Sequence, residues 1–216
     1  GVRVTPSAES GREGRSVTRP DVWLVRHGET EWSRDGRHTS RTELPLTARG
    51  EAEARALAPA LAGVGFDLVL ASPRARSADT AVLAGHPEAV PDPDLTEWDY
   101  GEYEGLTTPA IRETAPGWGL WTHPTPGGET ADQVAGRADR IIARVLAEAP
   151  ERALLVSHGH FLRVLASRWV GRPPRFGRYL LLATATLSIL GWERDNPALA
   201  RWNAPAIGSG LPGAAP

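Results

Sequence analysis

The sequence contains no cysteine and no lysine, so all 24 of its basic residues are arginines. Without cysteine the chain has no disulfide, no thiolate zinc site and no thiol nucleophile. Any chemistry must therefore use histidine, carboxylate, hydroxyl or arginine side chains.

The sequence also lacks a long apolar run and a surplus of one charge. No run approaches the roughly 18 to 20 apolar residues that cross a bilayer, and the first residues show no secretory signal. The net charge of −2 offers no basic surplus for nucleic acid or an anionic membrane. We expect a cytoplasmic protein that acts on a small molecule and binds neither nucleic acid nor membrane. The oligomeric state stays open, a homodimer included.

The length of 216 residues suits one globular domain. The first 20 residues are rich in Ser, Gly, Glu and Arg and show no apolar periodicity, and the end of the chain is equally poor in core-forming pattern. We therefore predict a flexible leader over residues 1–20, one domain over 21–203 and a disordered tail over 204–216.

Apolar strand-like runs alternate with helical patterns along the domain. Strands are expected at residues 21–26, 66–71, 153–157 and 184–192. Helices are expected at 47–61, with a kink at Pro59, at 72–84, after the Thr130 and Gln133 capping box, and after residue 158. This alternation predicts an α/β fold, a three-layer α/β/α sandwich with a mainly parallel central sheet.

In such sheets, ligands bind outside the carboxyl ends of the strands. Three of the predicted strands lead into His27, Arg74 and His158, and Arg26 precedes the first of these. Two histidines and two arginines with no nearby run of acids describe a site for a dianion. Phosphate fits, because guanidinium groups make paired charge-assisted hydrogen bonds to it.

Backbone groups are expected to complete this anion site. Helices that start near Ser72 and Gly159 would add N–H donors and a favourable dipole, and Gly28 and Gly159 would let the backbone approach the ligand closely. His158 and His160 could instead suggest a His-x-His metal site, but no nearby Asp or His completes a ligand set. We therefore expect no metal and no cofactor.

The segment LVRHGET at residues 24–30 resembles the Arg-His-Gly signature of the histidine phosphatase superfamily, which includes the cofactor-dependent phosphoglycerate mutases. Further blocks resemble those of the family in the expected order, at residues 36–47, 71–76, 97–105, 127–130 and 156–160. The resemblance covers roughly residues 21 to 192 and implies a phosphoglycerate mutase-like fold.

The resemblance also implies roles for individual residues. His27 would be the nucleophile that forms a phosphohistidine, and Arg26, Arg74 and His158 would be the other members of the phosphate pocket. Glu97 would be the general acid and base. The implied enzyme is a metal-independent histidine (acid) phosphatase, a phosphoric monoester hydrolase acting on a sugar phosphate or similar metabolite.

Other positions match the substrate side of the family's site. Ser33 falls where many relatives have an Asn that contacts the phosphate, Thr39 and Ser40 match a substrate-facing loop, and Tyr100 matches a residue near the leaving group. Gly28 and Gly159 join this set as backbone contacts. The segment 116–128, dense in Trp, Pro and Gly, is expected to form an irregular cover.

Two other functions stay open. A phosphoglycerate mutase would return the phosphoryl group from the phosphoenzyme to its substrate, but the block at residues 97–105 resembles the phosphatase branch more closely. A phosphate-binding module would have kept the fold and lost turnover, although every residue type that the catalysis needs is present.

Overall fold

The computed structural model describes residues 19–206. Most of the predicted leader and most of the predicted tail therefore lie outside the described residues. In the described part of the chain, no helix combines the length and the apolar character that a membrane crossing requires.

Six strands form one central sheet in the order β3-β2-β4-β1-β5-β6. The strands are β1 (Asp21–Arg26), β2 (Leu68–Ala71), β3 (Val90–Pro91), β4 (Arg152–Ser157), β5 (Thr186–Glu193) and β6 (Asn196–Pro205). Strands β3, β2, β4 and β1 pair in parallel, whereas β5 and β6 are antiparallel additions at one edge. The predicted α/β class with a mainly parallel sheet is confirmed.

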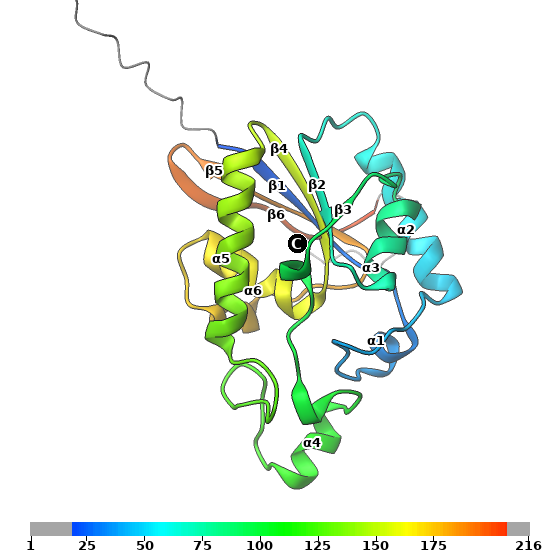
Figure 1. The fold of residues 1–216 in the computed structure, drawn as a ribbon, viewed down its shortest axis with the longest axis vertical. Coiled ribbons are helices and arrows are strands. Elements are labelled where there is room, and N and C mark those ends of the chain that lie inside the picture. Colours follow the sequence, from blue (N-terminus) through cyan, green and yellow to red (C-terminus); the bar gives the residue numbers. More distant parts are fainter. Residues whose placement is uncertain (1–18, 207–216) are drawn as a thin grey trace, which may run out of the picture.

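Helices cover both faces of the sheet, which gives three layers (Figure 1). One face carries α5 (Ala131–Glu148) and α6 (Gly159–Trp169), and the other carries α2 (Ala48–Leu61) and α3 (Ala75–Leu83). The shorter elements are α1 (Glu31–Asp35), α4 (Thr108–Thr114), and the 3-10 helices η1 (Pro93–Leu95), η2 (Gly101–Tyr103) and η3 (Pro174–Tyr179).

The alternation of side chains along β1 explains why the sheet needs both helical layers. Val22 and Leu24 belong to the core cluster shared with α5 and α6, whereas Val25 belongs to the cluster shared with α2 and α3. Successive strand residues point to opposite faces, so a strand with apolar residues at both parities is buried on both sides.

Local signals predicted most helix starts but not every boundary. Thr130 and Gln133 form the expected capping box of α5. Helix α3 begins at Ala75 with Arg74 as its N-cap, two residues later than expected. The predicted kink at Pro59 does not end α2, which continues to Leu61, because a proline in the last turn removes only one intrahelical hydrogen bond.

Strand β6 was not expected, and the predicted domain boundary at residue 203 falls inside it. It pairs with β5 through a tight hairpin in which Arg194 has a φ of 56°. As the edge strand of the sheet it has no fully buried side chain. Its sequence therefore carries little of the apolar pattern by which a strand is recognised.

Candidate functional site

The carboxyl ends of three neighbouring parallel strands bring the predicted site together. Arg26 at the end of β1 is in register with Ser157 at the end of β4, and Ala71 at the end of β2 is in register with Val156. The backbone N–H of His27 donates to the Ser157 carbonyl at 2.9 Å. Residues far apart in the chain therefore begin their loops from one edge of the sheet.

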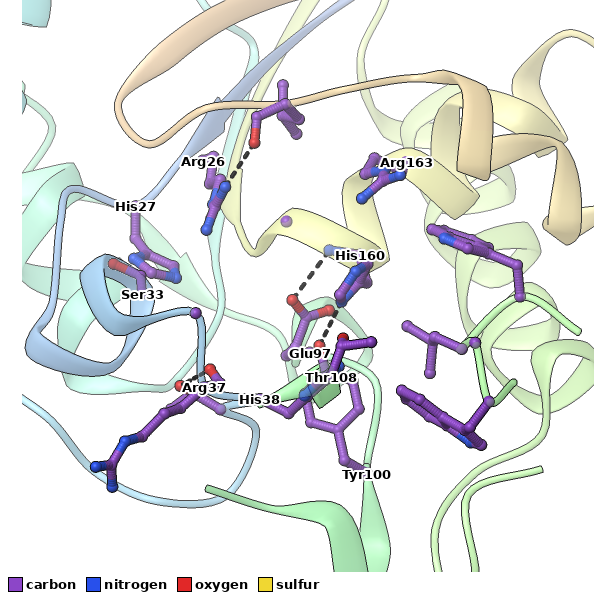
Figure 2. Close-up of a pocket in the computed structure, with 18 of the residues that line it drawn as sticks. Arg26, His27, Ser33, Arg37, His38, Glu97, Tyr100, Thr108, His160 and Arg163 are labelled. Atoms are coloured by element: carbon purple, nitrogen blue, oxygen red, sulfur yellow. Dashed lines mark hydrogen bonds between the residues drawn. The ribbon is translucent and has the colours of Figure 1, made fainter. Parts of the chain in front are cut away.

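A cavity of about 380 Å³ opens at this edge (Figure 2). The predicted site residues that line it are Arg26, His27, Ser33, Thr39, Glu97, Tyr100 and Gly159. Gly28, Ser40, Arg74 and His158 are not among the lining residues, although His158 touches one of them.

The ring of His27 is buried and held in one tautomer. Its Nδ1 lies 2.7 Å from the carbonyl oxygen of Gly28. Because a carbonyl only accepts hydrogen bonds, Nδ1 carries the proton and Nε2 keeps a lone pair. Burial lowers the pKa of His27 well below its ordinary value, and the positive charges of Arg76 and Arg26 act in the same direction. His27 is therefore a neutral imidazole with a free nitrogen.

His158 packs against His27 inside the protein. The two ring centroids are 5.1 Å apart at an interplanar angle of 65°. The Nε2 of His158 lies 2.8 Å from the Ser72 hydroxyl, and its Nδ1 has no hydrogen-bond partner among the described residues. Burial, followed by the charge of Arg76, holds the pKa of His158 well below its ordinary value. One ring nitrogen of the buried His158 is thus without a partner among the described residues.

Arg26 lies in the wall of the cavity, where Glu97 is the carboxylate that acts most strongly on it. Its Nη1 donates to the Leu182 carbonyl at 2.5 Å, and its buried Nε has no partner within the described region. Burial lowers the pKa of Arg26, while the nearby Glu97 opposes that effect. An arginine with unused donors at a cavity wall is suited to bind an anion.

Arg74 contacts Glu43 with one end of its guanidinium, while its buried Nε has no partner among the described residues. Its Nη1 donates to the Glu43 carboxylate at 3.0 Å, and the same carboxylate accepts the backbone N–H of Ala75 at 3.1 Å. Part of the Arg74 charge is therefore already matched by an acid. Its role in binding phosphate stays a prediction.

Arg76, which was not among the predicted site residues, carries the charge that acts most strongly on both histidines. It is fully buried, and its charge lowers the pKa of His27 and of His158 more than any other charge does. Its guanidinium donates to the carbonyls of Thr42 and Ser40 at 3.0 Å each, and its Nε has no partner in residues 19–206. Arg76 lies on the buried face of α3, and no apolar periodicity of the sequence marks that face.

The carboxylate of Glu97 is bound at the N-terminus of α6. Its Oε1 accepts backbone N–H groups of Trp98 and Phe161 at 2.9 and 2.8 Å, and its Oε2 accepts the N–H of His160 at 3.0 Å. These donors fix the carboxylate at the cavity wall. A carboxylate oxygen has room for two hydrogen bonds, so Oε2 keeps one position open.

Two of the predicted substrate-side hydroxyls are already engaged. The Ser33 hydroxyl donates to the Thr30 carbonyl at 3.0 Å and accepts the Thr30 N–H at 2.9 Å, as part of the cap of α1. The Thr39 hydroxyl donates to the Arg37 carbonyl at 3.1 Å. Both residues line the cavity, but a phosphate would have to compete for these hydroxyl groups.

Tyr100 forms part of the cavity wall. Ser40 lies outside the lining and contacts the backbone of Glu97. The buried Ser40 hydroxyl donates to the Glu97 carbonyl at 3.3 Å. The Tyr100 hydroxyl lies 2.6 Å from Nδ1 of His160, and burial raises the pKa of Tyr100 well above its ordinary value. Tyr100 is thus an uncharged phenol at the cavity wall.

Gly28 and Gly159 must be glycines for different structural reasons. A Cβ at Gly159 would lie 3.2 Å from the Arg26 guanidinium carbon, so this glycine lets the start of α6 approach the anion site. A Cβ at Gly28 would collide with the backbone carbonyl of Gly50 in α2. Gly159 therefore makes room for the Arg26 guanidinium and Gly28 is required by helix packing, while their predicted contacts with a ligand stay predictions.

Several cavity residues were not among the predicted site residues. They are Arg37, His38, Thr108, Arg112 and Arg163, together with His160, which the sequence suggested only as half of a His-x-His metal pair. His160 and Arg163 lie three residues apart in α6, which places them on one helix face. The segment 116–128 forms the expected cover, since Trp118 and Trp121 line the cavity.

Curated proteins similar to this chain include an acid phosphatase of Mycobacterium tuberculosis, 46% identical over 82% of this chain and 89% of that protein. Sedoheptulose 1,7-bisphosphatase of Saccharomyces cerevisiae is 33% identical over 70% of this chain and 68% of that protein. A probable phosphoglycerate mutase of Enterobacter sp. is also 33% identical, over 83% of this chain and 87% of that protein.

The fold has a counterpart among solved structures. The structure of an open reading frame of Mycobacterium tuberculosis superposes with a TM-score of 0.82 at 42% identity, and the match covers 87% of this chain and 98% of that one. Together with the curated relatives, it confirms the predicted phosphoglycerate mutase-like fold and the predicted enzyme class, a phosphatase. The model of the histidine phosphatase superfamily (branch 1) matches residues 22–205, and the chain belongs to this family.

Proposed function

We propose that the chain hydrolyses a small phosphorylated metabolite through a phosphohistidine on His27. The observation that carries this proposal is the placement of the His27 ring: it is buried at the cavity wall, and its Nδ1 lies 2.7 Å from the Gly28 carbonyl, which leaves the lone pair on Nε2. A neutral nitrogen with an available lone pair is a nucleophile, and covalent catalysis divides one difficult displacement into two easier ones.

In the first step, Nε2 of His27 attacks phosphorus, the P–N bond forms and the P–O bond to the leaving group breaks. Catalysis of such a transfer rests on positioning and on neutralising the charge of the phosphoryl oxygens. We assign that neutralisation to the guanidinium groups of Arg26 and Arg76, and we assign to the neutral ring of His158 a hydrogen bond from Nδ1 to a phosphoryl oxygen. Arg74 keeps its predicted place in this set, with less support because of its contact with Glu43.

Glu97 is assigned the proton transfers. Its open Oε2 position would hold the proton that goes to the leaving alkoxide oxygen, and the ionised carboxylate would then take a proton from the water that attacks the phosphohistidine. The three backbone N–H groups around the carboxylate hold it in one orientation at the cavity wall. Phosphate leaves, and His27 returns to its neutral state.

The decisive experiment is a rapid acid or base quench with a radiolabelled phosphomonoester. We expect label on the wild-type protein, stable to base and labile to acid as a phosphoramidate is, and none on His27→Gln. His86→Gln, which changes a histidine outside the cavity, serves as the matched control and should label normally. Phosphate release from an aryl phosphate without labelling of His27 would overturn the covalent mechanism.

The same assay addresses the mutase. If 3-phosphoglycerate is converted to 2-phosphoglycerate faster than phosphate is released from it, the chain is a mutase rather than a phosphatase in its main activity. A protein that binds phosphate but neither labels nor turns over would be the non-catalytic module. The cytoplasmic location and the homodimer stay predictions.

A further inference from the structure

A carboxylate that the proposed mechanism does not use lies next to the loop of His27. It belongs to Glu53 in α2, whose side chain is only 19% exposed. Its Oε2 accepts the backbone N–H of Glu29 at 3.2 Å and the hydroxyl of Thr184 at 3.1 Å. Its Oε1 pairs with Arg49 at 2.8 Å, as neighbours one turn apart on a helix surface do. One oxygen of Glu53 therefore joins two segments that are far apart in the chain.

The first of these segments is the loop that carries the nucleophile. Its three successive backbone N–H groups each have an acceptor on a different element. The N–H of His27 donates to a carbonyl of β4 at 2.9 Å, that of Gly28 to a hydroxyl of α3 at 3.0 Å, and that of Glu29 to the carboxylate in α2. The last of the three acceptors is charged, and hydrogen bonds to a charged group are the stronger kind. Glu53 thus contributes a strong restraint on the loop.

The second segment, residues 182–186, leads into β5 and holds Arg26. The Leu182 carbonyl accepts Nη1 of Arg26 at 2.5 Å (Figure 2). The backbone N–H of Ala185 lies 3.0 Å from the Arg26 carbonyl and 3.2 Å from the His27 carbonyl. The position of this segment therefore sets the guanidinium of Arg26 and the backbone on which the ring of His27 is carried.

The backbone of this segment is strained. Ala185 has a φ of 49°, a left-handed conformation that residues with a Cβ rarely adopt. Such a conformation persists only where the surrounding contacts hold it. Among these contacts are the Thr186 hydroxyl on the Ala183 carbonyl at 2.9 Å and the Thr184 hydroxyl on Glu53. The shape of the segment thus depends on its partners, of which Glu53 is the charged one.

Glu53 also acts on Arg26 through its charge. Burial lowers the pKa of Arg26, and the negative charge of Glu53 opposes this, after Glu97 and Tyr100. Unlike Glu97, Glu53 is not among the described residues that line the cavity. It therefore supports the buried cation without standing where a phosphate would bind.

We propose that Glu53 is a positioning residue, which holds the ring of His27 and the guanidinium of Arg26 in the arrangement that phosphoryl transfer needs. It acts through Oε2, by joining the loop of His27 to the segment 182–186. The inference rests on the proposed function, because the transfer that it supports is the one to His27. The competing interpretation is that Glu53 only pairs with Arg49 on the surface of α2.

The test follows the labelling of His27 by a radiolabelled aryl phosphate in a rapid quench, at a series of substrate concentrations. Glu53→Ala removes both hydrogen bonds of Oε2. We expect the labelling rate at saturating substrate to fall by about tenfold or more, the usual effect of losing one charge-assisted hydrogen bond. The concentration that gives half the maximal rate should change by about threefold or less, because a misplaced nucleophile slows the transfer without weakening substrate binding.

Two variants on the same helix separate the hydrogen bonds from a general effect on α2. Glu53→Gln can place its amide oxygen where Oε2 lies and accept both hydrogen bonds, so its labelling rate should return to within about threefold of the wild type. Glu51→Ala is the matched control, because the exposed Glu51 pairs with Arg55 at 3.1 Å in the same way as Glu53 pairs with Arg49. Its labelling rate should not change.

Thr184→Val breaks the same link from the other side and keeps the shape of the side chain. We expect a labelling rate about threefold to tenfold lower, which supplies the readout if Glu53→Ala does not fold. The double variant Glu53→Ala/Thr184→Val should be little slower than Glu53→Ala, because both changes remove one connection. Fully additive losses would show that the two residues do not act through each other, and would overturn the proposed link.

Other results would also overturn the inference. A wild-type labelling rate in Glu53→Ala, or an equal loss in Arg49→Gln, would reduce Glu53 to a surface ion pair. A loss that glutamine does not restore, or one confined to the half-saturating concentration, would mean that Glu53 acts through its charge on substrate binding. All of these outcomes leave the labelling of His27 in the wild type intact. If the wild type is not labelled, the proposed function fails, and the inference fails with it.

Discussion

The hydroxyl of Ser72 lies 2.8 Å from Nε2 of His158, although 86 positions separate the two residues. The contact joins the ends of β2 and β4, and it fixes a ring whose other nitrogen has no hydrogen-bond partner among the described residues. Ser72 therefore does more than precede a helix, because it orients His158, one of the residues that we propose to bind the phosphate group.

Ser72→Ala should lower kcat by about tenfold, the value of one neutral hydrogen bond of roughly 1 to 1.5 kcal/mol. The ring of His158 would lose its anchor while its shape stays unchanged. Ser77→Ala is the control, because its hydroxyl lies 3.5 Å from the same nitrogen and should matter less. Steady-state kinetics on an aryl phosphate measure both, and equal effects would contradict the anchoring role.

The contributions of Arg74 and Arg76 to catalysis can be measured separately by the same steady-state kinetics. Arg76→Gln should lower kcat by about 10² to 10³, the usual loss when one charge-stabilising donor is removed from such a site. Arg74→Gln, whose partner is Glu43, should cost less than about tenfold. Circular dichroism must show both variants folded, and the reverse order of effects would restore Arg74 as the phosphate ligand.

Arg74 was favoured from the sequence because it directly follows a Ser-Pro helix start. That rule places a residue along the chain, but it does not say which side of the helix faces the site. Arg76 lies on the buried face with Ser77 and Thr80, a stripe of small and polar residues that lacks the apolar signature of a core. The sequence also does not show how α6 is rotated about its axis, and this rotation decides that His160 and Arg163 face the cavity.

The pH dependence of stability follows from the buried histidines. His27, His158 and His160 have pKa values well below their ordinary value of 6.5. Below pH 6.5 the unfolded chain therefore binds protons that the folded chain does not, and stability falls as the pH falls. Each of the three contributes a slope of up to about 1.4 kcal/mol per pH unit.

Urea unfolding between pH 7.5 and 5 measures this slope. The carboxylates whose pKa values are lowered start from ordinary values of 4.5 and 3.8, so their contribution begins mainly below this window. His160→Gln should reduce the slope by one histidine's share. A free energy of unfolding that stays constant from pH 7.5 to 5 would show that these rings titrate alike in the folded and the unfolded protein, and that their pKa values are not lowered.

The order of strands and helices was predictable because periodicity and caps are local signals. Val22, Leu24 and Val25 mark a strand buried on both faces, and the Thr130 capping box marks the start of α5. The edge strand β6 was not predictable in the same way, since its side chains stay partly exposed. Likewise, the hydroxyls of Ser33 and Thr39 were expected to face a ligand, but each bonds to a nearby carbonyl.

Gly28 shows how a motif glycine can serve packing rather than a ligand. A Cβ at this position would collide with the Gly50 carbonyl, and its backbone N–H donates to the Thr80 hydroxyl at 3.0 Å. Gly28→Ala must therefore push α2 away from the loop that carries His27. We expect a loss of about 1 to 3 kcal/mol in the free energy of unfolding, as for other overpacked sites.

Gly65→Ala is the matched control, because a Cβ there would meet no atom within 4 Å and its backbone needs no left-handed conformation. Urea unfolding of the two variants gives the comparison. Because the loop of His27 shifts with Gly28, kcat should also fall in Gly28→Ala and not in Gly65→Ala. Equal stabilities of the two variants would mean that α2 moves without strain, and that Gly28 is required for the contact with the ligand rather than for packing.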